Sequence, residues 1–372
     1  MTATLRQGSA AVAEAAVAAG CRFFAGYPML PFTDLLEHMA KRLPEVGGTC
    51  MNAETEIEGV NMVLGAAAAG ARAATGSCGQ GIALMQETIA EAALNEVPFV
   101  VFNMARGQQD YFQCTRGGGW GDYRTITLAP KDVTEAVEHT QLLFHLADLY
   151  RAPTILYGDY LIAHTWMGVD VSAREYGPLP AKDWALDGSR GGTGTSRQVW
   201  TWAMGREDAP GPGPDAHWRA VAAKFDAMAA AEARHESHRV DDAEHLVVSF
   251  GTSAPFVEHV VDELREEGHR VGAFRPVTLW PFPEAALADA AEGCRSVMVF
   301  EVNAGQMVDD VRLALAGRCP VRFIGGVSID DSGMRQGPVL GVAAIRERVL
   351  AAMAEAPTPA AATPAAAPGG SR

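Results

Sequence analysis

The chain has 372 residues, 48% of them hydrophobic, and its 30 Lys and Arg against 45 Asp and Glu give a formal net charge of −15. This length suits about two to three domains. The acidity disfavours a nucleic-acid binder or a protein of anionic membrane surfaces, because both need a basic face. The N-terminus lacks the apolar core of a secretory signal and no apolar span of roughly 18 residues follows, so we expect a cytoplasmic protein without a membrane segment.

The cysteines argue against two common kinds of metal site. Six are spread along the chain: Cys21, Cys50, Cys78, Cys114, Cys294 and Cys319. None forms a C-x-x-C pair, so neither a zinc ribbon nor a run of iron–sulfur ligands is expected, and we assign no metal ligands to this chain.

Residues 1–165 alternate between strand-like and helix-like segments. Strands are expected at 22–27, 71–77, 98–104 and 153–159, and helices at 33–42, 55–71, 82–94 and 131–150. Short apolar runs bounded by turn signals, such as 98–104, are typical of strands buried in a parallel sheet. Because helices separate these strands, the segment predicts a doubly wound α/β domain whose sheet is covered on both faces.

Residues 166–236 change character and are expected to connect two domains. The stretch 184–216 is rich in Gly and Pro and holds Trp184, Trp200 and Trp202, which predicts an irregular segment pinned by its aromatic side chains. A helix is expected at 217–236, before the alternation of strands and helices resumes.

A second, smaller domain with a doubly wound parallel sheet is predicted over residues 237–352. Its expected strands are 245–251, 271–276, 296–303 and 321–326, and its expected helices are 254–268, 284–292 and 306–316. Trp280 and Phe282 are expected to fill a domain interface. Residues 353–372 form an Ala/Pro run that cannot bury a core, so this tail is predicted to be disordered.

A Gly-rich loop, Gly76-Ser77-Cys78-Gly79-Gln80-Gly81, lies between an expected strand and an expected helix. Such a loop can hold an anion on its backbone N–H groups, although it lacks the Lys of a P-loop and the spacing of a dinucleotide-binding fingerprint. The same position carries the nucleophile in hydrolases and glutaminases, which makes Cys78 a candidate nucleophile. A tight turn whose glycines only relieve crowding is the simpler interpretation.

Three carboxylates, Glu54, Glu56 and Glu58, lie at the start of the expected helix 55–71. Negative charge is favourable at any helix N-terminus, but a carboxylate that enters so apolar a helix points to a specific role. The spacing does not say which of the three has it. Arg106 follows the strand 98–104 at the edge where open α/β sheets bind ligands, and its position fits both a substrate carboxylate and a surface ion pair.

Longer segments resemble the alpha subunit of the 2-oxoacid:ferredoxin oxidoreductases, closest to the 2-oxoisovalerate and 2-oxoglutarate types. They lie in both expected domains and in family order: AGCRFFAGYP (19–28), NAETEIEGVNMVLGAAAAGARA (52–73), ALMQE (83–87), DYFQCTRGGGWGDYRTITLAP (110–130), GAFRPVTLWPFPE (272–284) and EVNAGQMVDDVRLA (301–314). The resemblance extends from about residue 7 to about residue 345. It is far more specific than any single glycine motif.

The resemblance implies that domain 1–165 binds the pyrimidine half of thiamine diphosphate and that domain 237–352 is like the C-terminal domain of transketolases. It implies oxidative decarboxylation of a 2-oxoacid to an acyl-coenzyme A in an active site shared with a beta subunit. That subunit would carry the diphosphate and Mg²⁺ site and a [4Fe–4S] cluster. A gamma subunit is a further candidate partner, ferredoxin would accept the electrons, and coenzyme A would be a co-substrate.

The resemblance also implies site residues. Glu56 aligns with the glutamate that bonds N1′ of the thiamine aminopyrimidine, and Arg106 aligns with the arginine that binds the 2-oxoacid carboxylate. The remaining expected contacts are Tyr27, Pro28, Gly79 and Gln80 to the cofactor, and Leu30 and Phe32 to the substrate.

Three departures from the family pattern affect the expected pocket. The family's YPITP turn reads Tyr27-Pro28-Met29-Leu30-Pro31 here, so a substrate-facing threonine becomes Leu30, which together with Phe32 favours an apolar, bulky 2-oxoacid. The family's S-G-P-G or S-S-P-G reads Cys78-Gly79-Gln80-Gly81. The Gly/Pro-rich loop after Arg106 is cut short, which is expected to open or reshape the pocket.

Other functions remain open at this point. The shortened loop motivates a non-redox thiamine-dependent decarboxylase or lyase subunit. A scaffolding subunit without chemistry of its own is a further alternative, against which the intact Glu56 argues. A hydrolase or amidotransferase with Cys78 as its nucleophile is the last.

Overall fold

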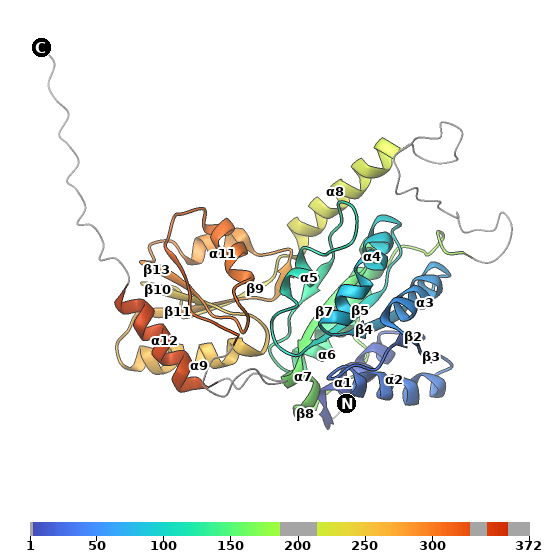
Figure 1. Cartoon of the computed structure of the whole chain (residues 1–372), viewed down its shortest axis with the longest axis horizontal. Coiled ribbons are helices and arrows are strands. Elements are labelled where there is room, and N and C mark those ends of the chain that lie inside the picture. The colour runs from blue at the N-terminus through green and yellow to red at the C-terminus, as the bar shows by residue number, and fades with distance from the viewer. Residues whose placement is uncertain (1–2, 187–213, 328–340, 356–372) are drawn as a thin grey trace, which may run out of the picture.

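A seven-stranded sheet organises the first half of the chain (Figure 1), in a computed structural model that describes residues 3–186, 214–327 and 341–355. The strands lie in the order β12-β6-β7-β5-β4-β2-β3. Their bounds are β2 Phe23–Gly26, β3 Thr49–Asn52, β4 Ala73–Ser77, β5 Val100–Ala105, β6 Ile126–Leu128, β7 Thr154–Asp159 and β12 Thr278–Trp280. Neighbouring strands pair in parallel except β12, which pairs antiparallel with β6.

Helices cover both faces of this sheet. On one face α1 (Gly8–Ala18) packs against α2 (Thr33–Glu45) and α6 (Val133–Tyr150), and on the other α3 (Glu56–Ala68) packs against α4 (Gln80–Leu94). The central strands β4, β5 and β7 are buried along their whole length, which explains why their sequences are small or apolar. The short helices α5 (Tyr111–Thr115) and α7 (Tyr160–His164) follow the carboxyl ends of β5 and β7.

The second domain has a five-stranded sheet of order β14-β13-β10-β11-β9, in which β9 is antiparallel and the other pairs are parallel. Its strands are β9 His235–His238, β10 His245–Val248, β11 Val271–Pro276, β13 Ser296–Val299 and β14 Val321–Phe323. Its helices are α9 Ala254–Glu266, α10 Glu284–Ala290, α11 Met307–Leu315 and α12 Val342–Ala354, and α8 (Pro214–Glu232) precedes it. The predicted class, two α/β domains built on mainly parallel sheets, is confirmed.

The structure differs from the expected elements in several places. The helix expected at 217–236 ends at Glu232, and the chain re-enters a sheet as β9 because this polar strand pairs with β11. A two-stranded sheet of β1 (Thr4–Gln7) and β8 (Trp166–Val169) was not expected. Most of the Gly/Pro-rich connector (187–213) and of the Ala/Pro tail (356–372) lies outside the described residues, and α12 continues to Ala354.

The two domains share one strand, β12, and buried polar contacts. β12 lies between elements of the second domain in sequence but extends the first sheet, and its Trp280 packs edge-on against Phe225 of α8 with the ring centroids 6.5 Å apart. Arg275 in β11 is 2% exposed and pairs with Glu135 of α6 at 2.8 Å and with Glu236 of β9 at 2.9 Å. Phe282 packs at the edge of the main core. The expected interface position of Trp280 thus agrees with the structure.

Candidate active site

Glu56 lies at the start of α3, at the carboxyl edge of the first sheet. The side chain of Thr55 accepts the N–H of Glu58 at 3.1 Å, and the Glu58 carboxylate accepts the N–H of Glu54 at 2.7 Å. This reciprocal cap satisfies two backbone donors and fixes the first turn of the helix. Glu54 is exposed and Glu58 is half-buried, whereas Glu56 is 4% exposed. The structure therefore separates the three carboxylates that their spacing left equivalent.

A close-fitting cradle surrounds the Glu56 carboxylate. The Ser77 hydroxyl, at the end of β4, donates to Oε1 of Glu56 at 3.1 Å. A Cβ on Gly81 would lie 2.4 Å from this Oε1 and 2.0 Å from the Ser77 Oγ, so any larger residue would have to displace one of these groups. Among the described residues Oε2 of Glu56 has no hydrogen-bond partner. This oxygen is available to a group from outside the chain.

Turns after three different strands meet beside this cradle. Arg106 directly follows β5, and its Nε donates to the Leu30 carbonyl while its Nη1 donates to the Gln80 Oε1, both at 3.2 Å. The N–H of Gly79, where φ is +52°, donates to the Asp110 carboxylate at 2.8 Å. Leu30, Gln80 and Arg106 are thereby held in one cluster at the carboxyl edge, where ligands of open α/β sheets bind.

Large apolar side chains are exposed on the elements that meet at this edge of the sheet, and we call them the apolar rim. They are Tyr27 (36% exposed), Leu30 (54%), Met51 (42%), Ile57 (48%) and Leu84 (50%). Tyr27, Pro28 and Leu30 follow β2, Met51 is in β3, and Ile57 and Leu84 lie in the first two turns of α3 and α4. Single exposed apolar residues are ordinary, but a group of them around a polar centre marks an interaction site.

Phe32 does not face this cluster, which corrects the expectation that it contacts the substrate. Its side chain is fully buried, and its ring stacks on Phe24 with the centroids 6.1 Å apart. A Cβ on Gly76 would lie 2.4 Å from the Phe32 ring, so the glycine makes room for it in the core. Phe32 therefore supports the turn from below.

Cys78 has the environment of a packing residue. Its side chain is fully buried, its thiol donates to the Leu30 carbonyl at 3.2 Å, and burial raises its pKa to about 11. A thiol with so high a pKa holds very little thiolate near neutral pH, and the thiolate is the nucleophile. This environment argues against the hydrolase alternative.

The residues expected from the family resemblance, Phe32 apart, are thus brought together at one edge. Sequence reasoning missed Ser77, Gly81 and Asp110, which hold the expected residues in place. The Gly-rich loop did signal close packing around Ser77 and Gly81 but not against what. Asp110 is a buried carboxylate in a loop, and burial raises its pKa. No sequence pattern distinguishes it from a solvated aspartate.

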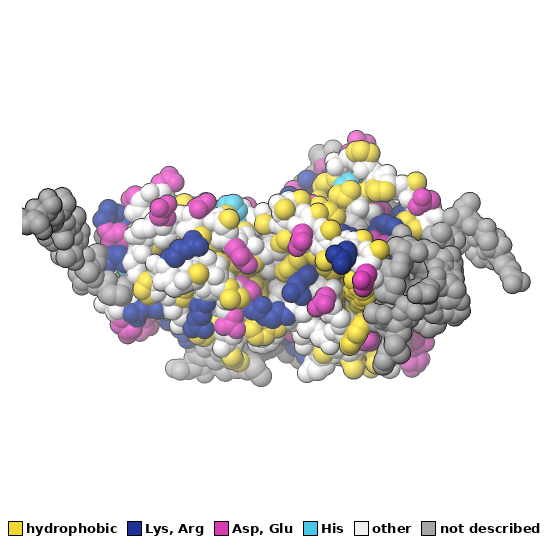
Figure 2. Space-filling view, turned by 90° about the horizontal axis from the view of Figure 1, so that it is seen from above, with side chains coloured by type: hydrophobic (Ala, Val, Ile, Leu, Met, Phe, Trp, Pro, Cys, Tyr) yellow, Lys and Arg dark blue, Asp and Glu magenta, His cyan; other side chains and the backbone are white. Residues whose placement is uncertain are grey.

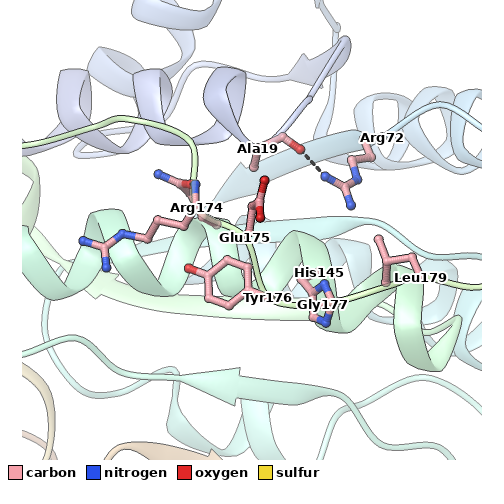
Figure 3. A pocket seen from close by; sticks show the side chains of 9 residues that line it. Ala19, Arg72, His145, Arg174, Glu175, Tyr176, Gly177 and Leu179 are labelled. Atoms are coloured by element: carbon pink, nitrogen blue, oxygen red, sulfur yellow. Dashed lines mark hydrogen bonds between the residues drawn. The ribbon is translucent and has the colours of Figure 1, made fainter. Parts of the chain in front are cut away.

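A separate hollow of about 350 Å³ lies at the opposite edge of the first sheet, beside Arg72 at the start of β4 (Figure 3). Arg72 donates to the Ala19 carbonyl and pairs with Asp148 at 2.8 Å, and both ends of the Gln141 amide bond the segment 172–174. The chain thus satisfies these polar groups itself. Within the described ranges, no three His, Cys, Asp or Glu side chains are grouped to hold a metal ion, and no helix is long and apolar enough to cross a membrane.

Comparison with known proteins identifies the family. Residues 14–183 match the family described as pyruvate flavodoxin/ferredoxin oxidoreductase, thiamine diphosphate-binding, and residues 243–335 match the pyruvate:ferredoxin oxidoreductase core domain II. The ketoisovalerate oxidoreductase subunit VorB of Methanothermobacter marburgensis is 35% identical over 324 residues, which cover 84% of this chain and 90% of VorB. The chain belongs to the 2-oxoacid:ferredoxin oxidoreductase family.

Further members of the 2-oxoacid:ferredoxin oxidoreductase family agree. The 2-oxoglutarate synthase subunit KorA of Methanothermobacter thermautotrophicus is 33% identical, covering 86% of this chain and 92% of KorA. The solved 2-oxoglutarate:ferredoxin oxidoreductase of Magnetococcus marinus, with 2-oxoglutarate, coenzyme A and succinyl-CoA bound, has a TM-score of 0.78 and 25% identity. The match covers 94% of this chain but only 65% of that one. The chain is therefore an oxidoreductase subunit whose first domain is of the thiamine diphosphate-binding type.

Proposed function

We propose that this chain is the pyrimidine-binding alpha subunit of an enzyme that oxidatively decarboxylates a 2-oxoacid to an acyl-coenzyme A and passes the electrons to ferredoxin. One observation carries the proposal. The buried Glu56 bonds Ser77 through Oε1 and leaves Oε2 without a partner among the described residues, at an edge surrounded by the apolar rim. A thiamine diphosphate-binding domain with such a carboxylate would form one half of an active site that another subunit completes.

The residues at this edge fit the aminopyrimidine half of thiamine diphosphate. The unpartnered Oε2 of Glu56 and the exposed apolar side chains on the neighbouring turns suit a flat heteroaromatic ring with a polar edge. When bound, thiamine diphosphate supplies the carbon nucleophile that adds to the keto group and the electron sink for decarboxylation. Oε2 of Glu56 would accept a hydrogen bond from the protonated N1′ of the ring. The apolar surroundings would strengthen this bond. Tyr27, Pro28, Gly79 and Gln80 would contact the ring from the neighbouring turns.

Arg106 would bind the carboxylate of the 2-oxoacid. Its planar guanidinium lies at the same edge as Glu56, and this group matches a carboxylate with two parallel hydrogen bonds. Leu30, whose carbonyl accepts from Arg106, presents an exposed apolar side chain beside it. An apolar 2-oxoacid is therefore favoured over a dicarboxylic one. The preference rests on Leu30 alone, since Phe32 is in the core.

We infer that a beta subunit covers the apolar rim and completes the active site. The family resemblance assigns to that subunit the diphosphate and Mg²⁺ site and the [4Fe–4S] cluster, with a gamma subunit as a further partner in a cytoplasmic complex. Figure 2 shows Lys and Arg interspersed with Asp and Glu on one face of this chain, whose net charge is −15. A basic surface for an acidic ferredoxin would then lie on the partner.

Anaerobic turnover tests the proposal. The complex is purified through a tag on this chain and supplied with thiamine diphosphate, Mg²⁺, coenzyme A and an oxidised viologen dye. We expect a branched-chain or aromatic 2-oxoacid to reduce the dye. If a complex that binds thiamine diphosphate reduces no dye with branched, aromatic or dicarboxylic 2-oxoacids, the oxidoreductase reaction is wrong. Release of CO₂ without dye reduction would then identify the non-redox decarboxylase, and no turnover at all the scaffolding subunit.

A further inference from the structure

The short loop after Arg106 is covered by the second domain. β5 ends at Ala105 and α5 begins at Tyr111, so only residues 106–110 connect them. Gly107 and Gln108 are buried, and the Gly107 carbonyl accepts from the Tyr157 hydroxyl at 3.4 Å. The sequence led us to expect that shortening this loop opens or reshapes the pocket. The described structure instead shows a loop that is held in place.

Gln108 makes most of the contacts to the second domain. It is 3% exposed, and its Nε2 donates to the Phe250 carbonyl at 2.9 Å and to the Ser253 hydroxyl at 3.3 Å. Its Oε1 accepts the N–H of Val302 at 2.7 Å, its own N–H donates to the Val302 carbonyl at 3.3 Å, and its carbonyl accepts from the Asn303 amide at 2.8 Å. Side chain and backbone of this one residue are therefore satisfied by the second domain.

The groups that hold Gln108 are themselves fixed. Glu301 is fully buried, and its carboxylate accepts from the Asn303 amide and from the backbone N–H of Gln306, Met307 and Val308, at 2.8 to 3.0 Å. It thereby orders the turn 301–306 and caps α11. Gln306 adds one bond to the loop, from its Nε2 to the Gln109 carbonyl at 2.8 Å, and one to α5, from the Phe112 N–H to its Oε1 at 2.9 Å.

Arg106 is consequently held from both sides. The preceding strand β5 is paired with β4 and β7 in the middle of the first sheet, and the backbone two residues later is bonded to the second domain. Between these anchors the Arg106 side chain donates to the Leu30 carbonyl and to the Gln80 Oε1. A shift of about 1 Å in a substrate-binding group is enough to impair an enzyme by orders of magnitude.

The geometry points to Gln108 as a positioning residue through which the second domain fixes Arg106 for the carboxylate of a 2-oxoacid. This inference rests on the proposed function, because it takes Arg106 as the substrate-binding group. It gives the second domain a part in substrate binding from a distance. A loop with few residues then suffices, because the second domain supplies the order that a longer loop would have to supply itself.

Replacement of neighbouring glutamines tests the inference in the intact complex. Gln108→Met keeps the length of the side chain and removes its hydrogen bonds, and Gln306→Met releases the loop from the surface side. Gln109→Met is the matched control, because the Gln109 side chain is exposed. The measurements are kcat and KM for the 2-oxoacid, and hydrogen–deuterium exchange of the peptide that covers residues 106–110.

We expect Gln108→Met to raise KM about 10-fold with kcat changed less than about 3-fold, because a misplaced Arg106 weakens binding before and during the reaction alike. Exchange of peptide 106–110 should become faster. Gln306→Met should raise KM and the exchange rate in the same direction but more weakly, and it provides the test if Gln108→Met fails to fold. Gln109→Met should match the wild type in both measurements. Unchanged exchange in both test variants, or a loss of kcat at constant KM, overturns the inference.

The exchange measurement separates this inference from the proposed function. If the wild-type complex turns over no 2-oxoacid, the proposed function fails, while the exchange rates still show whether Gln108 holds the loop. If the wild-type complex is active and Gln108→Met has wild-type KM and exchange, the proposed function stands and the positioning role is wrong.

Discussion

Two neighbouring loops at the same edge of the first sheet are built in opposite ways. The turn between β4 and α4 lies beside Glu56, and the helices α3 and α4 carry exposed apolar side chains there, Ile57 and Leu84. The loop 106–110 after β5 is covered by the second domain. The side-chain amide and the backbone N–H and carbonyl of its Gln108 all form hydrogen bonds with residues of that domain.

The difference shows which side of the site the chain completes itself. Buried polar groups need partners, and the loop 106–110 finds its partners within the chain. Glu56 instead has an oxygen without a partner among the described residues. Changes near Glu56 should therefore impair the chemistry and the assembly, whereas changes at the junction of the two domains should affect positioning and stability.

The largest effect is expected from Glu56→Gln. The amide keeps the shape of the side chain but cannot hold a proton for the cofactor, so kcat should fall by about 10²- to 10⁴-fold. Turnover of the complex measures this, with Glu54→Gln as control because its carboxylate is exposed. Size-exclusion chromatography should show an intact complex. Wild-type activity of Glu56→Gln would reject the role assigned to this carboxylate.

Gly81→Ala should reduce kcat by about 10²-fold, because the new Cβ must displace the Glu56 carboxylate or the Ser77 hydroxyl. The matched control is Gly168→Ala in β8, where an added Cβ meets nothing within 4 Å. Both variants are compared in the same turnover assay. If Gly81→Ala is as active as Gly168→Ala and the wild type, the close packing of Gly81 against Glu56 and Ser77 is not needed for activity.

Ile57→Asp and Leu84→Asp should weaken binding of the beta subunit, because each buries a charge in the expected interface. We expect an increase of Kd by about 10- to 100-fold per change, measured by sedimentation or titration with the partner. Leu313→Asp is the control, since this residue is 68% exposed but lies on α11 of the second domain. If all three variants bind the beta subunit with wild-type affinity, the partner binds another surface.

The smallest effect concerns His139 in α6, near the junction of the domains. Burial and the charges of Arg275 and Arg234 lower its pKa to about 3, so the folded chain leaves it neutral where the unfolded chain protonates it. This histidine therefore lowers the free energy of unfolding as the pH falls below about 6.5, by about 2 kcal/mol at pH 5. We expect the free energy of unfolding, measured with urea, to fall less between about pH 7.5 and about pH 5 in His139→Gln than in the wild type.

The control for this measurement is His259→Gln, because the His259 side chain is 60% exposed. It should leave the loss of stability between the two pH values as in the wild type. If His139→Gln also leaves it unchanged, His139 is not a source of the acid sensitivity.

Most of the fold could be predicted from local pattern. The strand expected at 271–276 has the same bounds as β11, and the other expected strands of both sheets differ from the structure only at their ends. The short strands β3 and β6 were not among the expected elements, and β9 and β12 could not be predicted in this way. β9 is polar and exposed, so it shows no apolar alternation, and β12 follows β11 in the chain but pairs with β6 of the other sheet.

The site divides in the same manner. Glu56 stands out because a carboxylate at the head of an apolar helix is unusual, and the family resemblance then gives it a role. Gln108 gives no such signal, since a glutamine in a polar loop ordinarily faces water. Its burial depends on Val302 and Asn303, almost 200 positions further along the chain. Phe32 was misjudged because its side chain turns toward Phe24 in the core rather than toward the exposed edge.

Hydrophobic pattern, turn residues and family motifs were therefore enough for two α/β domains and the oxidoreductase family, and they singled out Glu56, whose role stays a prediction. Each of these patterns and motifs lies within a short stretch of the sequence, so it can be recognised before the chain is folded. The tertiary structure decided that Ser77 and Gly81 form the cradle, that Phe32 belongs to the core, and that the second domain holds the loop after Arg106. Burial and hydrogen bonding between distant segments determine these features, and neither is defined until the chain has folded.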